Sequence, residues 1–210
     1  EYVFKNIGRD EVNGMDKWLA GATTHDGGHL IRSKLDLVKL LGCDVEDRTM
    51  FVPIQFPRLA KSPGSVVVGF QLGTSQPVRC WPVERFVALA KKILSCSPEH
   101  SIVLVGDGRE HEYESSFLAG LDPEERARVK SHVGKTSLPQ LAAVVEGMDV
   151  LVTGDTGTMH LAIALKVRTV SLFVTADPNQ TGPYQDSHLH QVIYVPFKPE
   201  NLDPAQHDRP

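Results

Sequence analysis

The chain has 210 residues, of which 41% are hydrophobic and 23% charged, and this is the composition of a globular protein that buries a core. Its formal net charge of −4 argues against a nucleic-acid partner, which would require a basic surface. No apolar run approaches the ~20 residues of a membrane helix and no signal peptide is visible, so we expect a cytoplasmic protein without a membrane span. Cys43, Cys80 and Cys96 show no metal-ligand spacing, which favours reduced thiols.

The first 65 residues are weakly patterned. Residues 1–27 are mostly polar residues and glycine, and we expect them to be irregular. Apolar residues then recur at helical spacing and predict a helix over 29–41, with Gly42 as its C-terminal stop. Residues 43–65 contain several prolines and are typical of an extended linker, in which 51–54 could form a short edge strand.

From residue 65 onward, short apolar runs alternate with amphipathic stretches. The runs predict strands at 66–70, 102–106, 129–133, 150–152, 169–173 and 192–195. The stretches predict helices at 82–94, 110–121 and 138–145, and another that starts near 157. This alternation indicates βαβ units, and hence an α/β fold with a Rossmann-like, doubly wound parallel sheet over residues 65–196.

The most informative segment is residues 153–162, which read Thr-Gly-Asp-Thr-Gly-Thr-Met-His-Leu-Ala. An apolar run precedes it and helical spacing follows, so the pattern predicts a buried strand, a tight turn and the first turn of a helix. The first N–H groups of a helix have no partners within the helix and attract anions. Taken alone, however, the segment is better explained as a helix start that Asp155 or Thr156 caps.

Four loops follow the predicted strands at the edge of the sheet where ligands of open α/β folds bind. They cover residues 71–79, 106–110, 134–137 and 153–158. Together they supply glycines for close approach, hydroxyl donors and cations, which is the mixture that phosphate binding needs. Their coincidence on one edge indicates a nucleotide-type ligand.

Several well-known functional motifs are only partly matched by the sequence, and we exclude them. Lys135 lies in a Gly-Lys-Thr sequence, but Val129 stands where a P-loop needs its first glycine, and no strand is followed by the three-glycine dinucleotide fingerprint. Residues 155–158 are similar to the active-site sequence of aspartic proteases, yet they lead into a helix rather than an all-β fold. His188 and His190 are expected on one face of a strand, but a third ligand is missing, so we expect no metal.

Taken together, the loops resemble the C-terminal domain of glycosyltransferase family 9, the ADP-heptose:lipopolysaccharide heptosyltransferases. The resemblance extends from about residue 66 to 183. Its markers are four ordered blocks: Gly73-Thr74-Ser75 with Arg79-Cys80-Trp81-Pro82, then residues 105–110, 134–138 and 155–162. It implies a GT-B architecture of two Rossmann-like domains, in which the second domain holds the nucleotide-sugar donor.

The resemblance also implies a set of donor-binding residues. Arg79 stands where the family usually has lysine and could neutralise the diphosphate, whereas Glu110 matches an acidic position associated with the ribose. Gly154 departs from the asparagine that is frequent in the family. Leu138 and Met148 could line the base pocket, although a core position is the simpler interpretation for both. The full set for the nucleotide, diphosphate and sugar is Thr74, Ser75, Arg79, Glu110, Asp155, Thr156, Gly157, Thr158 and His160.

A complete member of this family carries its own N-terminal domain, which binds the acceptor and supplies the catalytic base. Residues 1–64 are too short for that domain, and the chain starts at Glu1 with its first methionine at Met15. We therefore expect a fragment: a remnant and interdomain linker over 1–64, the donor-binding domain over 65–196, and a tail over 197–210.

The function implied is the inverting, metal-independent transfer of heptose from ADP-heptose to the lipopolysaccharide inner core. No cofactor is expected beyond the donor itself. The partners are the nucleotide sugar and, through the missing domain, the lipopolysaccharide acceptor, which suits a protein at the cytoplasmic periphery of the inner membrane. Without its base, the isolated fragment is expected to be inactive. Two alternatives remain open: a nucleotide-sugar epimerase or hydrolase, and a non-catalytic module that binds a nucleotide sugar.

Overall fold

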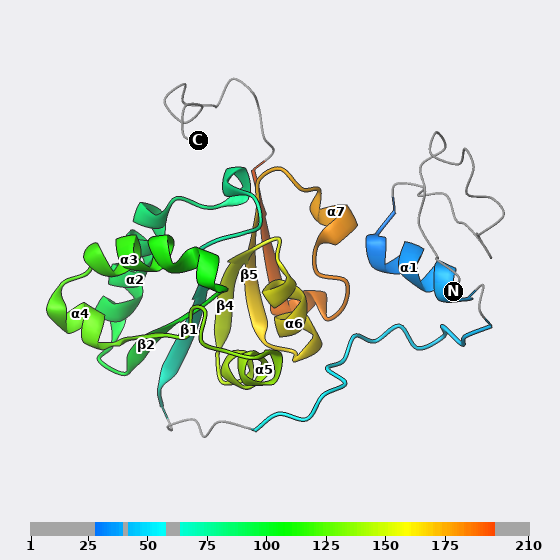
Figure 1. Cartoon of the computed structure of the whole chain (residues 1–210), viewed down its shortest axis with the longest axis horizontal. Coiled ribbons are helices and arrows are strands. Elements are labelled where there is room, and N and C mark those ends of the chain that lie inside the picture. Colours follow the sequence, from blue (N-terminus) through cyan, green and yellow to red (C-terminus); the bar gives the residue numbers. More distant parts are fainter. Residues whose placement is uncertain (1–27, 40–41, 58–63, 196–210) are drawn as a thin grey trace.

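A single six-stranded parallel sheet forms the centre of the computed structural model, which describes residues 28–39, 42–57 and 64–195 (Figure 1). The strand order is β3-β2-β1-β4-β5-β6. In chain order the strands are β1 (Val66–Gln71), β2 (His100–Val105), β3 (Val129–Ser131), β4 (Val150–Gly154), β5 (Arg168–Phe173) and β6 (His190–Tyr194). This parallel α/β arrangement confirms the fold class expected from the sequence.

The strand order reverses at β1. Val68 pairs with Ile102 of β2 on one side and with Val150 of β4 on the other. The chain therefore builds β1, β2 and β3 outward and returns to add β4 beside β1. In open α/β sheets, the crevice at such a reversal is where ligands bind, beyond the carboxyl ends of the strands.

Helices cover both faces of the sheet (Figure 1). Alternate residues of each strand point to opposite faces, so Val68 lies in the cluster under helices α2 and α3, and Val67 lies in the cluster under α5 and α6. The helices are α1 (Leu30–Lys39), α2 (Val83–Cys96), α3 (His111–Ala119), α4 (Pro123–Ala127), α5 (Leu138–Glu146), α6 (Gly157–Ala164) and α7 (Pro178–Thr181), with 3-10 turns η2 (Pro77–Arg79), η3 (Gly108–Glu110) and η4 (Ser187–Leu189). In the described part of the chain, none of these helices is long and apolar enough to cross a bilayer.

An aromatic cluster fills the core beneath α2 and α3. Phe70 of β1 contacts Phe86 at a centroid distance of 5.3 Å and Phe117 at 6.0 Å. Trp81 packs edge-to-face on Phe86 at 4.8 Å. Tilted and edge-to-face contacts of this kind are favourable beyond the area they bury. These contacts hold the end of β1, which leads directly into the loop at residues 71–79.

Two reciprocal hydrogen bonds join Met50 of the linker to Gln185, which lies in the loop between α7 and η4. The N–H group of Met50 donates to Gln185 Oε1 at 2.6 Å, and Gln185 Nε2 donates to the carbonyl of Met50 at 3.4 Å. The Met50 side chain packs against a cluster that contains Met159, Ile163 and Phe173. Helix α1 lies beside α7, and His29 bonds to the carbonyl of Gly182 at 3.0 Å (Figure 1).

Several element predictions were wrong in detail. Residues 51–54 form no strand, and Phe51 is 72% exposed. Pro82 is the N-cap of α2 rather than its first helical residue. His188 lies in η4 and His190 begins β6, so the two histidines do not share a strand. The short helices α4 and α7 are absent from the predicted elements, and residues 1–27, 40–41, 58–63 and 196–210 lie outside the described part of the chain.

Candidate functional site

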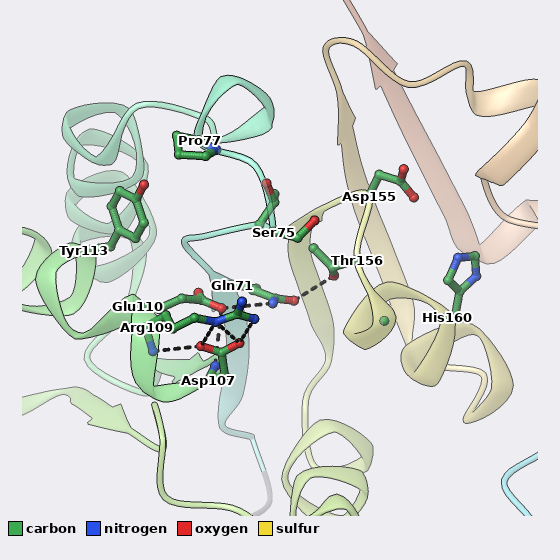
Figure 2. A pocket seen from close by; sticks show the side chains of 12 residues that line it. Gln71, Ser75, Pro77, Asp107, Arg109, Glu110, Tyr113, Asp155, Thr156 and His160 are labelled. Carbon is green, nitrogen blue, oxygen red and sulfur yellow. Dashed lines mark hydrogen bonds and ion pairs between the residues drawn. The ribbon is translucent and has the colours of Figure 1, made fainter. Parts of the chain in front are cut away.

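A cavity of about 540 Å³ opens at the carboxyl edge of the sheet, where the loops after β1, β2 and β4 meet. Side chains from the first two loops face those of the third across it (Figure 2). The residues that line it are Gln71, Thr74, Ser75, Pro77, Asp107, Arg109, Glu110, Tyr113, Asp155, Thr156, Gly157 and His160. The cavity therefore lies at the reversal of strand order between β1 and β4.

The start of α6 presents free donors to this cavity. Thr156 is the N-cap, in extended conformation, and its hydroxyl oxygen accepts from the N–H group of Met159 at 3.3 Å. No described residue accepts from the N–H groups of Gly157 and Thr158, as expected at the first turn of a helix. A Cβ on Gly157 would meet no atom within 4 Å, so a ligand can approach this backbone. The capping role and an anion-binding role thus use different groups of the same turn.

Asp155 lines the cavity and is paired with the guanidinium of Arg79. Arg79 Nη1 lies 3.8 Å from Asp155 Oδ2, and the two side chains are 30% and 15% exposed, respectively. Arg79 Nε is buried and has no partner among the described residues. The guanidinium offsets the charge of the carboxylate, which would otherwise oppose an anion at this turn.

Glu110 is the most buried charged group of the site, with 7% of its surface exposed. Its Oε2 accepts from the N–H group of Gly73 at 2.8 Å, and its Oε1 accepts from Gln71 Nε2 at 3.3 Å and from the N–H group of Asp107 at 3.4 Å. Burial raises the pKa of Glu110, and the hydrogen bonds from Gly73, Gln71 and Asp107 act in the opposite direction. A carboxylate offers about four acceptor positions, so about one remains for a ligand hydroxyl.

Glycine is required opposite this carboxylate. A Cβ on Gly73 would lie 2.8 Å from Glu110 Cγ, and a Cβ on Gly106 would lie 2.6 Å from Glu110 Cδ. Both distances are shorter than real contacts between carbon atoms. The loops after β1 and β2 can therefore close around Glu110 only because both positions lack a side chain.

The loop after β2 ends in a self-contained polar cap. Asp107 is the N-cap of η3, and its carboxylate accepts from both the backbone and the guanidinium of Arg109. Tyr113 follows Glu110 by one helical turn and lines the same side of the cavity (Figure 2). Burial and the neighbouring Cys80 raise the pKa of Tyr113, so its phenol stays protonated and can donate a hydrogen bond.

Comparison with known proteins identifies the family. The model of glycosyltransferase family 9 (heptosyltransferase) matches residues 52–200. The chain belongs to glycosyltransferase family 9. Lipopolysaccharide heptosyltransferase 2 of Salmonella typhimurium is 32% identical over 128 residues, which are 60% of this chain and 36% of that protein. Lipopolysaccharide heptosyltransferase 1 of Pseudomonas aeruginosa is 36% identical over 138 residues, which are 65% of this chain and 37% of that protein.

The chain thus spans little more than a third of the length of these curated relatives. The solved structure of the Escherichia coli ADP-heptose lipopolysaccharide heptosyltransferase II matches it with a TM-score of 0.67 at 24% identity. That match covers 84% of this chain and 57% of the solved one. It shows the shared fold and confirms the expected GT-B type of Rossmann-like sheet.

Most of the donor-binding residues predicted from the family 9 resemblance meet at the cavity. Seven line it: Thr74, Ser75, Glu110, Asp155, Thr156, Gly157 and His160. Arg79 and Thr158 are not among the lining residues: Arg79 contacts the cavity only through its ion pair with Asp155, and Thr158 is buried. A core position was the simpler interpretation for both Leu138 and Met148. Met148 is buried in the core as expected, but Leu138 is 62% exposed.

Five lining residues are absent from the predicted donor-binding set: Gln71, Pro77, Asp107, Arg109 and Tyr113. Of these, only Tyr113 lies outside the loops 71–79 and 106–110 that were expected at the ligand edge. Gln71 could have been noticed as a polar residue at the end of an apolar strand. One departure from the family pattern also has a physical reason. A Cβ on Gly154 would lie 2.9 Å from Thr74 Cγ2, so the larger asparagine that is frequent here would collide with the loop after β1.

The half-buried imidazole of His160 predicts an acid-sensitive fold. Burial lowers the pKa of His160 from 6.5, and the electrostatic effect of Lys34 acts in the same direction, whereas the carboxylate of Asp155 opposes it. Below about pH 6.5 the unfolded chain therefore binds a proton that the native state excludes, so stability falls as the pH drops and returns as it rises. We expect thermal scans between pH 5.5 and 7.5 to give a shallower pH slope of the melting temperature for His160→Gln than for the wild type. Identical slopes would show that His160 takes up its proton without cost in the native state.

Proposed function

We propose that the cavity binds the nucleoside diphosphate of a sugar donor, and that the chain is the donor-binding part of a heptosyltransferase. The observation that carries this proposal is the set of unbonded N–H groups at the start of α6, facing the hydroxyl-bearing loop after β1. Family membership and the relatives named as lipopolysaccharide heptosyltransferases support heptose as the sugar. The E. coli protein described as an ADP-heptose heptosyltransferase supports ADP as the nucleotide.

The diphosphate is assigned to the region between α6 and the loop after β1. The N–H groups of Gly157 and Thr158 point their partial positive charge at this region. Thr74 uses its hydroxyl within its own loop, since Oγ1 donates to the carbonyl of Gln76 at 2.7 Å. Ser75 is therefore the hydroxyl donor for a phosphate oxygen, and Thr74 orders the loop that presents it.

The nucleoside is assigned to the opposite end of the cavity. The remaining acceptor position of Glu110 suits a ribose hydroxyl, which donates a hydrogen bond to a carboxylate. Tyr113 flanks this end with a neutral phenol. Asp155 and His160 are then left at the end from which the sugar extends, where a carboxylate can accept from sugar hydroxyls.

The reaction proposed is a single displacement with inversion at the anomeric carbon. A bond forms from the acceptor oxygen to that carbon, and the bond from the carbon to the diphosphate oxygen breaks, with its electron pair leaving on ADP. The extra negative charge on the departing diphosphate is met by the first turn of α6 and by Arg79, so the chemistry needs no metal ion. The base that takes the acceptor proton is assigned to a further domain, as is the binding of the lipopolysaccharide core.

This assignment divides the chain in the way proposed from the sequence. Residues 65–196 form the donor-binding domain, residues 1–64 belong to the preceding domain and linker, and residues 197–210 form a tail. Among the described residues, the segment before the sheet is joined to the sheet domain by the bonds between Met50 and Gln185 and by the contacts of His29 and α1 with Gly182 and α7.

Two experiments test the proposal together. Calorimetric titration of the 210-residue chain with ADP should give one binding site. The gene product that contains this chain, incubated with labelled ADP-heptose and heptose-deficient lipopolysaccharide, should transfer the label to the lipid. Intact donor with no transfer would contradict the transferase assignment and favour a binding module. Conversion of the donor without transfer would indicate an epimerase or hydrolase.

A further inference from the structure

Gln71 occupies a position that the proposed chemistry does not use. It is the last residue of β1, at the reversal of strand order, and it is only 8% exposed. Its Nε2 donates to Glu110 Oε1 at 3.3 Å. Its Oε1 accepts from the hydroxyls of Thr156 at 2.8 Å and Thr153 at 3.3 Å. A single side chain thus joins the nucleoside end of the cavity to the turn before α6 (Figure 2).

The chemistry of these groups fixes the orientation of the Gln71 amide. An ionised carboxylate only accepts hydrogen bonds, so the amide NH₂ of Gln71 must face Glu110 and its oxygen must face the threonines. The hydroxyl of Thr156 donates to Gln71 at 2.8 Å, and its oxygen accepts from the N–H group of Met159. The hydroxyls of Thr153 and Thr156 also lie 3.0 Å apart, so both threonines belong to the same network. The N-cap of α6 is therefore held in one orientation by a carboxylate two strands away.

The same series reaches the two loops on the other side of the cavity. Glu110 accepts from the backbone of Gly73 after β1 and of Asp107 after β2. The bonds run without interruption from the first turn of α6, through Gln71, to both loops. Loss of the central amide would leave buried donors and acceptors unpaired on both sides, which is the costly case for buried polar networks.

We propose that Gln71 is a positioning residue that sets the distance and orientation of the ribose-binding carboxylate relative to the phosphate-binding turn. Resting on the proposed function, this inference gives Gln71 a role in selecting a nucleoside diphosphate. The two ends of such a ligand are separated by a fixed span, and both ends of the cavity must match it at once. Gln71 acts through Glu110 and Thr156 and makes no bond to the ligand in this scheme.

The test uses two substitutions of Gln71 and one control in the 210-residue chain. Gln71→Met keeps the length of the side chain without its polar atoms, and Gln71→Glu keeps its shape but places a second carboxylate about 3.3 Å from Glu110. Gln191→Glu makes the same charge change on the exposed face of β6, far from the cavity. ADP affinity is measured by calorimetry at pH 5.5 and pH 8, and each variant is compared with the wild type at the same pH. Near-UV circular dichroism shows whether each variant is folded.

We expect Gln71→Met to lose about tenfold or more in ADP affinity at both pH values, because buried polar groups are left unpaired. Gln71→Glu should lose at least as much at pH 8, where two adjacent carboxylates repel each other. It should recover most of that loss at pH 5.5, where the pair shares a proton and the protonated oxygen donates as the amide did. Gln191→Glu should match the wild type throughout.

The outcomes that would overturn the inference are distinct from failure of the proposed function. Wild-type affinity in folded Gln71→Met, or a loss in Gln71→Glu that does not change between the two pH values, would show that Gln71 only fills space. Should Gln71→Met not fold, the pH recovery of Gln71→Glu decides the matter alone. A wild-type chain that binds no ADP would instead remove the proposed function.

Discussion

Arg79→Ala is expected to weaken ADP binding to this chain by roughly 10- to 100-fold, since a hydrogen bond to a charged group contributes about 1.5–3 kcal/mol and each tenfold corresponds to about 1.4 kcal/mol. Two effects add. The variant loses a cation beside the diphosphate, and it leaves the carboxylate of Asp155, now 3.8 Å from the guanidinium, without its counter-charge. Calorimetric titration with ADP measures the loss directly.

Arg79→Lys is the matched control for this experiment. Lysine restores a positive charge but not the planar fork of the guanidinium, and it is the residue that the family resemblance places at this position. We expect it to recover most of the affinity, because the role proposed is charge neutralisation rather than bidentate recognition. An Arg79→Ala variant that binds ADP as tightly as the wild type would remove Arg79 from the site, and the residue would then only anchor Asp155.

Phe70→Ala is expected to lower the free energy of unfolding by about 3–5 kcal/mol, as large aromatic truncations in cores do. Phe70 is fully buried and contacts both Phe86 and Phe117 in the aromatic cluster. At roughly 2–4 °C per kcal/mol for a chain of this size, the melting temperature should fall on the order of 10 °C. Thermal unfolding followed by circular dichroism measures this change.

The same truncation at an exposed phenylalanine controls for the chemistry of the substitution. Phe51 is 72% exposed in the linker, so Phe51→Ala should change the melting temperature by little. Equal effects at the two positions would contradict the placement of Phe70 in the core. Loss of ADP affinity in Phe70→Ala at a temperature where it remains folded would indicate that the cluster also positions the loop after β1.

Local pattern was enough to predict the sheet. Most strands are short apolar runs and the longest helix, α2, is an amphipathic stretch, so the α/β class followed without tertiary information. The same reasoning failed at residues 51–54, where apolar residues between prolines suggested an edge strand. The contact that holds this segment is the pair of bonds between Met50 and Gln185, 135 positions later, and no local pattern reports such a partner.

The site was predicted less completely, for a related reason. Residues such as Ser75 and Gly157 lie in loops whose composition already suggests phosphate binding, and they line the cavity. Gln71 and Tyr113 lie in regular elements, and they reach the cavity only because the strand order reverses beside β1. The loop composition could not show which hydroxyls are free, and Thr156 directs its hydrogen to Gln71.

The proposal that the first turn of α6 binds the diphosphate is tested most directly by titrating the ¹⁵N-labelled 210-residue chain with ADP and following the amide chemical shifts. We expect the largest shifts on the N–H groups of Gly157 and Thr158, with further shifts in the loops around Ser75 and Glu110. A second cavity is lined by residues 46–49, Lys166 and residues 184–186. Shifts that are absent at the start of α6, or that are centred on this second cavity, would contradict the assignment of the diphosphate to α6.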